Sequence, residues 1–191
     1  MGKKLVRRFQ RSHREGFSLV EVTILALLLL VAVGGLSGAV LSSLRLSRTT
    51  EESALADEAA RALAGSLQTE TFAELFRRHN ENPADDPGGV PGSAPGAAFD
   101  VRGLTARTDD ADGRVGRIVF PAVDLGGGVQ ALREDVSDVR LGMAEGRDLN
   151  GNGVPNEDAT NNYVLLPARL IVEWTGAGGN RSYELDLVLV P

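Results

Sequence analysis

Hydrophobic and polar positions divide the chain into three regions, of which the first is the most apolar. Residues 22–44 form a run of 23 residues without a charge. A helix of this length measures about 35 Å, enough to cross a hydrocarbon core of about 30 Å. The run exceeds the apolar core of about 7 to 15 residues found in a cleavable secretory signal. The pattern therefore predicts a transmembrane helix, which we assign to residues 17–44.

Residues 45–79 carry the pattern of an amphipathic helix that continues the first one. The segment has no proline and is rich in alanine, which favours helix. Its apolar positions recur every three or four residues, as on one helix face: Leu55, Ala59, Leu63, Leu67, Phe72, Leu75 and Phe76. A free surface helix would leave these side chains uncovered. We therefore expect one helix from residue 17 to about residue 79, with its second half packed against a sheet.

Residues 80–191 read as a globular head built from strands. Pro and Gly predict a loop over 80–98,. Apolar runs then predict six strands, at 98–102, 117–122, 129–133, 139–144, 163–174 and 182–190,. The Gly-rich linker 175–181 predicts that the last two form a hairpin. A long N-terminal helix, first transmembrane and then amphipathic, packed on a small antiparallel sheet gives the α+β class.

Composition limits the chemistry that the chain can perform. It has no cysteine and two histidines, His13 and His79, which lie far apart in sequence, so thiol chemistry is excluded and no histidine pair forms a base or metal motif. The glycines at 126–128 lack a P-loop lysine and read as a hairpin turn. We therefore expect no enzyme activity and no certain cofactor.

Charge separates the first 16 residues from the rest. Six basic residues precede Gly16 and only Glu15 opposes them, so the positive-inside rule places residues 1–16 in the cytoplasm and the head on the other side. Without these residues the net charge would change from −6 to −11, because six basic residues and one acidic residue are lost. Such an acidic chain is not expected to bind nucleic acid.

Glu21 is the one charge inside the apolar segment. A carboxylate at the mouth of a membrane helix costs roughly 1 to 3 kcal/mol, depending on its depth. An ordinary signal anchor has no use for it. We therefore expect a cation from a partner to meet Glu21.

The segment Gly16-Phe17-Ser18-Leu19-Val20-Glu21-Val22 resembles the cleavage signal of type IV pilins and type II secretion pseudopilins. The resemblance implies a pilin-like fold and cleavage by prepilin peptidase after Gly16, which removes the leader 1–16. It also implies methylation of Phe17 and an ion pair between Glu21 and the amino terminus of a neighbouring subunit. The expected partners are the peptidase, other pilins or pseudopilins in a helical filament, and the bacterial inner membrane. The head would lie in the periplasm or outside the cell. Unlike many pilins, this chain has no cysteine to close a C-terminal loop.

One loop of the head has the spacing of a calcium site. Oxygen-bearing residues alternate from residue 148, with a glycine at the sixth position, as in calcium loops. The candidate ligands are Asp148, Asn150, Asn152, the carbonyl of Val154, Asn156 and Asp158. The loop resembles an EF-hand-like or thrombospondin-type loop, although Ala159 stands where the bidentate Glu would be. A chain of turns explains the same residues without a metal.

These observations favour a structural filament subunit, a minor pilin or minor pseudopilin. The alternative is an adhesive or ligand-binding subunit at a filament tip, whose recognition surface is the head loop with calcium. A plain signal-anchored membrane protein is a third possibility, and Glu21 argues against it.

Overall fold

A computed structural model describes residues 18–127 and 129–191. The chain divides into two compact units, Met1–Leu44 and Arg45–Pro191. The first helix, α1 (Leu19–Thr69), contributes residues to both. In the first unit, residues 19–44 are helical and every one of them is exposed. This part of α1 is long and apolar enough to cross a membrane.

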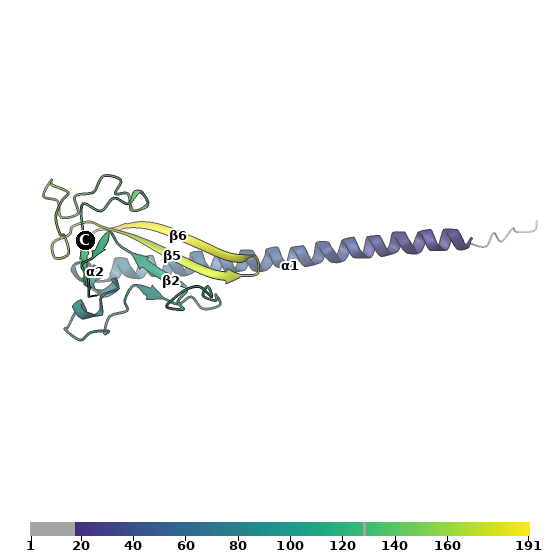
Figure 1. The fold of residues 1–191 in the computed structure, drawn as a ribbon, viewed down its shortest axis with the longest axis horizontal. Helices are drawn as coiled ribbons and strands as arrows, with labels where there is room; N and C mark the ends of the chain where they lie inside the picture. Colours follow the sequence, from purple (N-terminus) through teal and green to yellow (C-terminus); the bar gives the residue numbers. More distant parts are fainter. Residues whose placement is uncertain (1–17, 128) are drawn as a thin grey trace, which may run out of the picture. The chain divides into compact units, whose positions relative to one another are not determined.

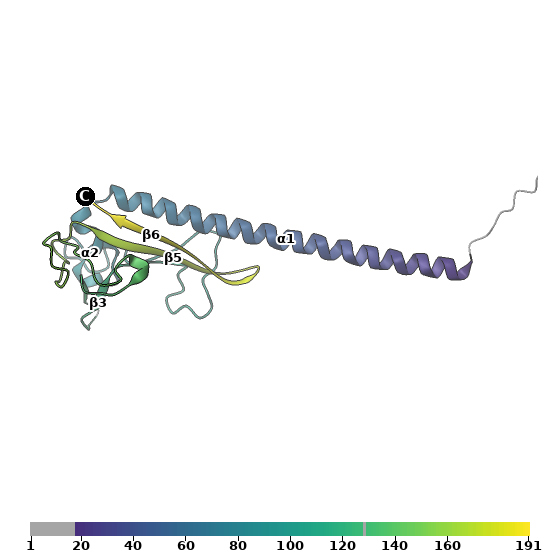
Figure 2. The same cartoon turned by 90° about the horizontal axis from the view of Figure 1, so that it is seen from above.

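The second unit packs the C-terminal part of α1 against an antiparallel sheet, so the expected α+β arrangement is present (Figures 1 and 2). The fully buried residues of α1 are Ala56, Ala60 and Leu67. They lie four and seven residues apart, which places them on one helix face. The predicted row centred on Leu55, Ala59 and Leu63 is therefore turned slightly away from the sheet. Alanine at the buried positions leaves room for larger side chains from the sheet.

The predicted helix is ten residues too long, because α1 ends at Thr69. A 3-10 turn, η1 (Phe72–Glu74), and a short helix, α2 (Leu75–His79), follow. The Tyr163 hydroxyl donates a 2.6 Å hydrogen bond to the Phe72 carbonyl and accepts one from the Phe76 N–H. The Glu70 carboxylate accepts a hydrogen bond from Arg78. These contacts favour the break, which buries apolar side chains that a straight helix would carry past the sheet.

The main sheet has the strand order β1-β2-β5-β6 and is antiparallel throughout. Its strands are β1 (Ala98–Phe99), β2 (Gly116–Val119), β5 (Leu166–Gly176) and β6 (Gly179–Leu189). The last two pair along their full length around a tight turn, so the predicted C-terminal hairpin is confirmed. The side chains of β5 are buried on both faces through Val172, which explains its nearly continuous apolar sequence.

Two short strands, β3 (Ala122–Asp124) and β4 (Gln130–Leu132), form a separate antiparallel pair. The predicted hairpin turn at 126–128 lies between these two strands, although Gly128 is outside the described residues. A 3-10 turn, η2 (Pro83–Asp85), lies in the predicted loop. The predicted strand 139–144 is wrong, because Val139–Leu141 forms the 3-10 turn η3. Asp138 caps this turn by accepting hydrogen bonds from Arg140 and Leu141.

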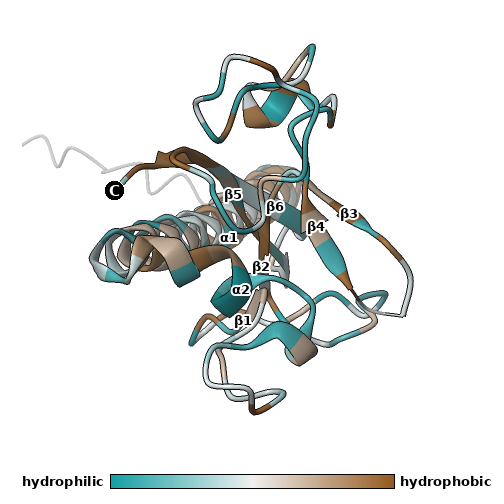
Figure 3. Cartoon of the chain, turned by 90° about the vertical axis from the view of Figure 1, so that its left-hand side faces the viewer, coloured by the Kyte–Doolittle hydropathy of each residue, from teal (hydrophilic) through white to brown (hydrophobic). Residues whose placement is uncertain are grey.

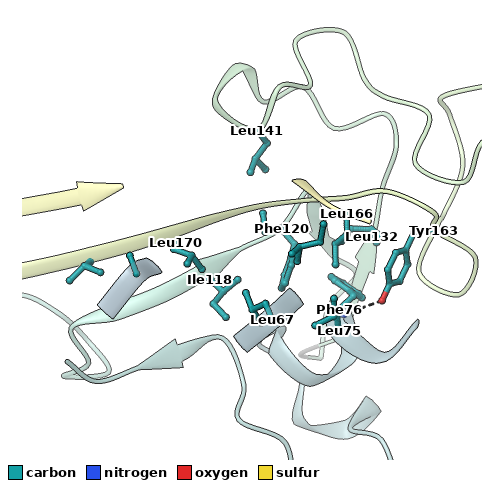
Figure 4. Close-up of a cluster of buried hydrophobic side chains, with 14 of the residues drawn as sticks. Leu67, Leu75, Phe76, Ile118, Phe120, Leu132, Leu141, Tyr163, Leu166 and Leu170 are labelled. Carbon is teal, nitrogen blue, oxygen red and sulfur yellow. Dashed lines mark hydrogen bonds between the residues drawn. The ribbon is translucent and has the colours of Figure 1, made fainter. Parts of the chain in front are cut away.

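One hydrophobic core joins the helices to the sheet (Figure 4). Phe76 packs edge-to-face on Phe120, with ring centroids 5.5 Å apart. Phe72 packs in the same way on Tyr163. Burial raises the pKa of Tyr163. Seen along the helix, the more polar loops lie around the apolar centre (Figure 3).

Candidate functional site

The apolar part of α1 is the first candidate site. Its large side chains are not covered by any other part of residues 18–127 and 129–191, and representative values of exposure are 66 % for Leu29 and 67 % for Leu36. Glu21 lies in the first turn of the helix and is exposed. The cleavage site, Gly16 and Phe17, lies outside the described residues. Cleavage, methylation and the partner of Glu21 therefore stay predictions.

The loop 148–158 of the second unit is held by hydrogen bonds from its own backbone. The Asp148 carboxylate accepts bonds from the N–H groups of Gly151, at 2.6 Å, and Gly153, at 2.7 Å, and a longer one from Asn152. The side-chain oxygen of Asn150 accepts from Asn152 at 2.9 Å. Side chains that accept from N–H groups two to five residues further on are typical of tight turns.

Three other predicted calcium ligands, Asn152, Val154 and Asp158, also accept hydrogen bonds from backbone N–H groups. The Asn152 oxygen accepts from the Val154 N–H at 2.7 Å, and the Val154 carbonyl accepts from the Asn156 N–H at 2.9 Å. Asp158 accepts from Thr160. No group of three His, Cys, Asp or Glu side chains that could hold a metal occurs within residues 18–127 and 129–191. The described hydrogen bonds of Asp148, Asn150, Asn152, Val154 and Asp158 require no cation, and calcium binding stays a prediction.

A buried carboxylate, Glu134, organises this loop and was not predicted from the sequence. Its side chain is fully buried. One oxygen accepts from the N–H groups of Leu149 (2.9 Å) and Asn150 (3.1 Å), and the other accepts from Glu157 (3.1 Å). The Glu134 side chain thus joins both ends of the loop. Backbone N–H groups can stabilise a buried carboxylate because they satisfy its acceptor positions.

The backbone of Glu134 strengthens the same junction. Its N–H donates to the Glu157 carbonyl at 3.2 Å, and its carbonyl accepts from the Arg147 N–H at 2.9 Å. Gly146, at φ +83°, lies against it, and a Cβ there would be 2.7 Å from the Glu134 carbonyl. A side chain at residue 146 is therefore excluded by both conformation and space.

A second junction joins the β5–β6 hairpin to α1 within the second unit. The Glu52 carboxylate accepts bonds from the Trp174 indole N–H at 3.3 Å and from the Ala177 N–H at 3.2 Å. A Cβ at Gly176 would lie 1.9 Å from a Glu52 oxygen. Only glycine at residue 176 therefore lets Glu52 approach the turn.

A neighbouring contact extends this junction by one helical turn. The Tyr183 hydroxyl donates a hydrogen bond to Asp57, and the Arg61 guanidinium donates to the same carboxylate at 2.7 Å. These two donors lower the pKa of Asp57, with the tyrosine having the larger effect. The same bond raises the pKa of Tyr183. The helix and hairpin therefore share a polar seam as well as an apolar core.

The face of the sheet turned away from α1 carries paired charges. Arg169 of β5, whose side chain is 5 % exposed, pairs with Asp186 and, at 3.8 Å, with Glu184. Arg140 reaches Glu184 at 3.6 Å. The hydrogen bond with Asp186 raises the pKa of Arg169.

Comparison with known protein families finds no family that matches the chain, and comparisons with curated proteins and with solved structures find no significant match.

Proposed function

We propose that the chain is a minor pilin or minor pseudopilin, a structural subunit of a type IV pilus or type II secretion filament. The observation that carries this proposal is that the sequence segment 16–22 runs into the start of an apolar helix whose residues 19–44 are all exposed. A helix that is apolar all round requires a membrane or other helices around it. In this proposal the membrane surrounds the helix before assembly, and the helices of neighbouring subunits surround it in the filament core.

The proposed mechanism is assembly. Prepilin peptidase removes residues 1–16, and Phe17 becomes the methylated amino terminus. The helix then leaves the bilayer and packs among the helices of neighbouring subunits, where Glu21 pairs with a neighbour's amino terminus. In an apolar environment a carboxylate without such a partner is strongly disfavoured, so the pair would fix the register of each entering subunit. The α+β arrangement of the second unit, with α1 packed on a small antiparallel sheet, supports the proposal without identifying a family.

The first part of the test is processing. The full chain is produced with and without a type IV prepilin peptidase, and the membrane fraction is analysed by intact mass. We expect a product that begins at N-methyl-Phe17 only when the peptidase is present. A chain that keeps its first 16 residues in the presence of active peptidase contradicts the proposal.

The second part of the test is filament entry. Glu21→Ala is compared with Thr23→Ala, a substitution in the same turn of the helix that leaves the carboxylate in place. Both variants should be cleaved and inserted. Glu21→Ala should enter sheared filaments at least about tenfold less than wild type, which corresponds to about 1.4 kcal/mol. Equal entry of the two variants contradicts a role for Glu21 in assembly.

A further inference from the structure

Strand β6 forms a long edge of the main sheet. It pairs with β5 on one side and, in the part of the chain that the structure describes, has no strand on the other (Figure 1). Its register with β5 is regular from Leu189 to Gly179, without a bulge. Edge strands in proteins are commonly protected by shortness, bulges, proline or charged side chains, lysine above all. Strand β6 has 11 residues and neither proline nor lysine.

The register identifies which backbone groups point outward. Gly176 and Gly179 flank a two-residue turn, so they form a hydrogen-bonded pair, and such pairs recur at every second residue. The odd-numbered residues of β6 therefore bond to β5. Consistently, the N–H groups of Glu173 and Thr175 point the other way, to the carbonyls of Val115 and Thr105. The even-numbered residues carry the outward groups: Ser182, Glu184, Asp186 and Val188.

These outward N–H and C=O groups have no hydrogen-bond partner among the described residues. The side chains of the same four residues are exposed. A backbone edge of this kind is a template for an added strand.

The two faces of β6 define the chemistry of the strand that would fit. On the helix side, Leu185 and Leu187 remain partly exposed, so an added strand gains from apolar residues there. On the other face, the side chains of Glu184 and Asp186 are 40 % and 59 % exposed. Two cations already lie beside them: Arg169 pairs with Asp186 and lies 3.8 Å from Glu184, and Arg140, itself 69 % exposed, lies 3.6 Å from Glu184. An ionised carboxylate accepts several hydrogen bonds, so both exposed acids can still meet basic side chains of an added strand.

A second copy of β6 fits the edge poorly. Antiparallel pairing about the middle of the strand would place Glu184 opposite Glu184. Like charges directly opposite destabilise a strand pair. The net charge of the chain, −6, adds repulsion between copies.

We propose that the free edge of β6 binds an extended segment of another protein that alternates apolar and basic residues. Its apolar side chains lie beside Leu185 and Leu187, and its basic side chains lie beside Glu184 and Asp186. Its backbone bonds to the outward groups of β6. This interaction does not depend on the proposed function, since it requires only the folded second unit.

The test uses the full chain in detergent micelles and two seven-residue peptides, one alternating Val and Lys and the other alternating Val and Glu. Amide hydrogen exchange is followed at the outward residues 182, 184, 186 and 188. The Val/Lys peptide should slow their exchange by about tenfold or more at saturation. The inward amides of 183, 185 and 187 should change little, because they are already bonded to β5.

A pair of substitutions tests whether binding uses the backbone edge. Ser182→Pro removes one outward N–H, and proline is tolerated at such edge positions. It should weaken peptide binding by about tenfold, as expected for the loss of one hydrogen bond, whereas Ser182→Ala should bind like wild type. Fluorescence of Trp174, the one tryptophan of the chain, reports whether each variant is folded.

A charge-reversal variant keeps the test decisive should the proline variant fail to fold. Glu184→Lys retains the pairing of Arg169 with Asp186 and should favour the Val/Glu peptide. Equal protection by both peptides overturns the basic preference, and no protection by either overturns the edge site. Protection that rises with protein concentration and needs no peptide overturns the proposal in favour of a second copy.

Discussion

Substitution of the buried Glu134 by Gln tests whether one carboxylate holds the 148–158 loop. The change keeps the shape of the side chain but replaces one acceptor oxygen with a donor NH₂ group. If the remaining oxygen keeps its bonds to Leu149 and Asn150, the NH₂ group faces the N–H of Glu157, which is then left without its acceptor. Two donors, the Gln NH₂ group and the Glu157 N–H, then face each other in place of a donor and an acceptor.

The expected loss of stability follows from these three bonds. A hydrogen bond to a charged group contributes about 1.5 to 3 kcal/mol and a neutral one about 0.5 to 1.5, so two bonds weaken by about 1 kcal/mol each. The unsatisfied buried N–H costs about 1 to 3 kcal/mol more. Relief from burying a charge offsets part of this sum. We therefore expect a net destabilisation of about 2 to 4 kcal/mol.

Thermal unfolding of the full chain in micelles, followed by the fluorescence of Trp174, measures the effect. For a unit of this size the melting temperature should fall by about 4 to 16 °C. The amides of Leu149, Asn150 and Glu157 should also exchange faster, because their acceptor is weakened or lost.

Glu145→Gln is the matched control, since Glu145 is exposed in the same part of the chain, and it should change stability by less than about 0.5 kcal/mol. Equal melting temperatures for the Glu134 and Glu145 variants would refute the assigned role of Glu134.

Two further predictions concern the hairpin junction and the loop. Gly176→Ala should cost about 1 to 2 kcal/mol, because the new Cβ displaces Glu52 from Trp174 and Ala177; in a Glu52→Ala background it should cost less than about 0.5 kcal/mol, and additive costs in this double-mutant cycle would contradict the contact. If the loop binds calcium, the ion should stabilise the chain by about 1.4 kcal/mol at ten times its Kd, and magnesium should do much less. Asp148→Asn should abolish that response, although it also weakens the metal-free loop by removing an acceptor of backbone N–H groups. Equal stabilisation of the chain by calcium and by magnesium would mean that the loop is only a set of turns and no calcium site.

The sequence predicted the parts of the fold that local periodicity controls. The apolar run, the alanine-rich helix and the alternation over 182–190 each have one period over many residues, so the helix as far as Thr69 and the C-terminal hairpin were correct. The end of α1 was missed because the sequence beyond Thr69 remains compatible with helix. The chain turns there because Tyr163, far away in sequence, bonds to Phe72 and Phe76.

The error at 139–144 has a related cause. Apolar residues there alternate as in a strand, yet the Asp138 side chain caps η3 and accepts the N–H groups of Arg140 and Leu141. A local side-chain acceptor therefore outcompetes pairing with another strand, because it satisfies the same donors without ordering a second segment.

Glu134 and Glu52 show why sites built from long-range contacts leave little trace in a single sequence. Neither belongs to a motif, and in sequence each reads as an ordinary surface acid. In the structure each carboxylate accepts N–H groups from a segment distant along the chain, Glu52 across more than 120 positions. Two glycines mark these places, since Gly176 and Gly146 leave space for a Glu52 oxygen and for the Glu134 carbonyl. Because an acid and a glycine become partners only after folding, their spacing in sequence has no fixed period.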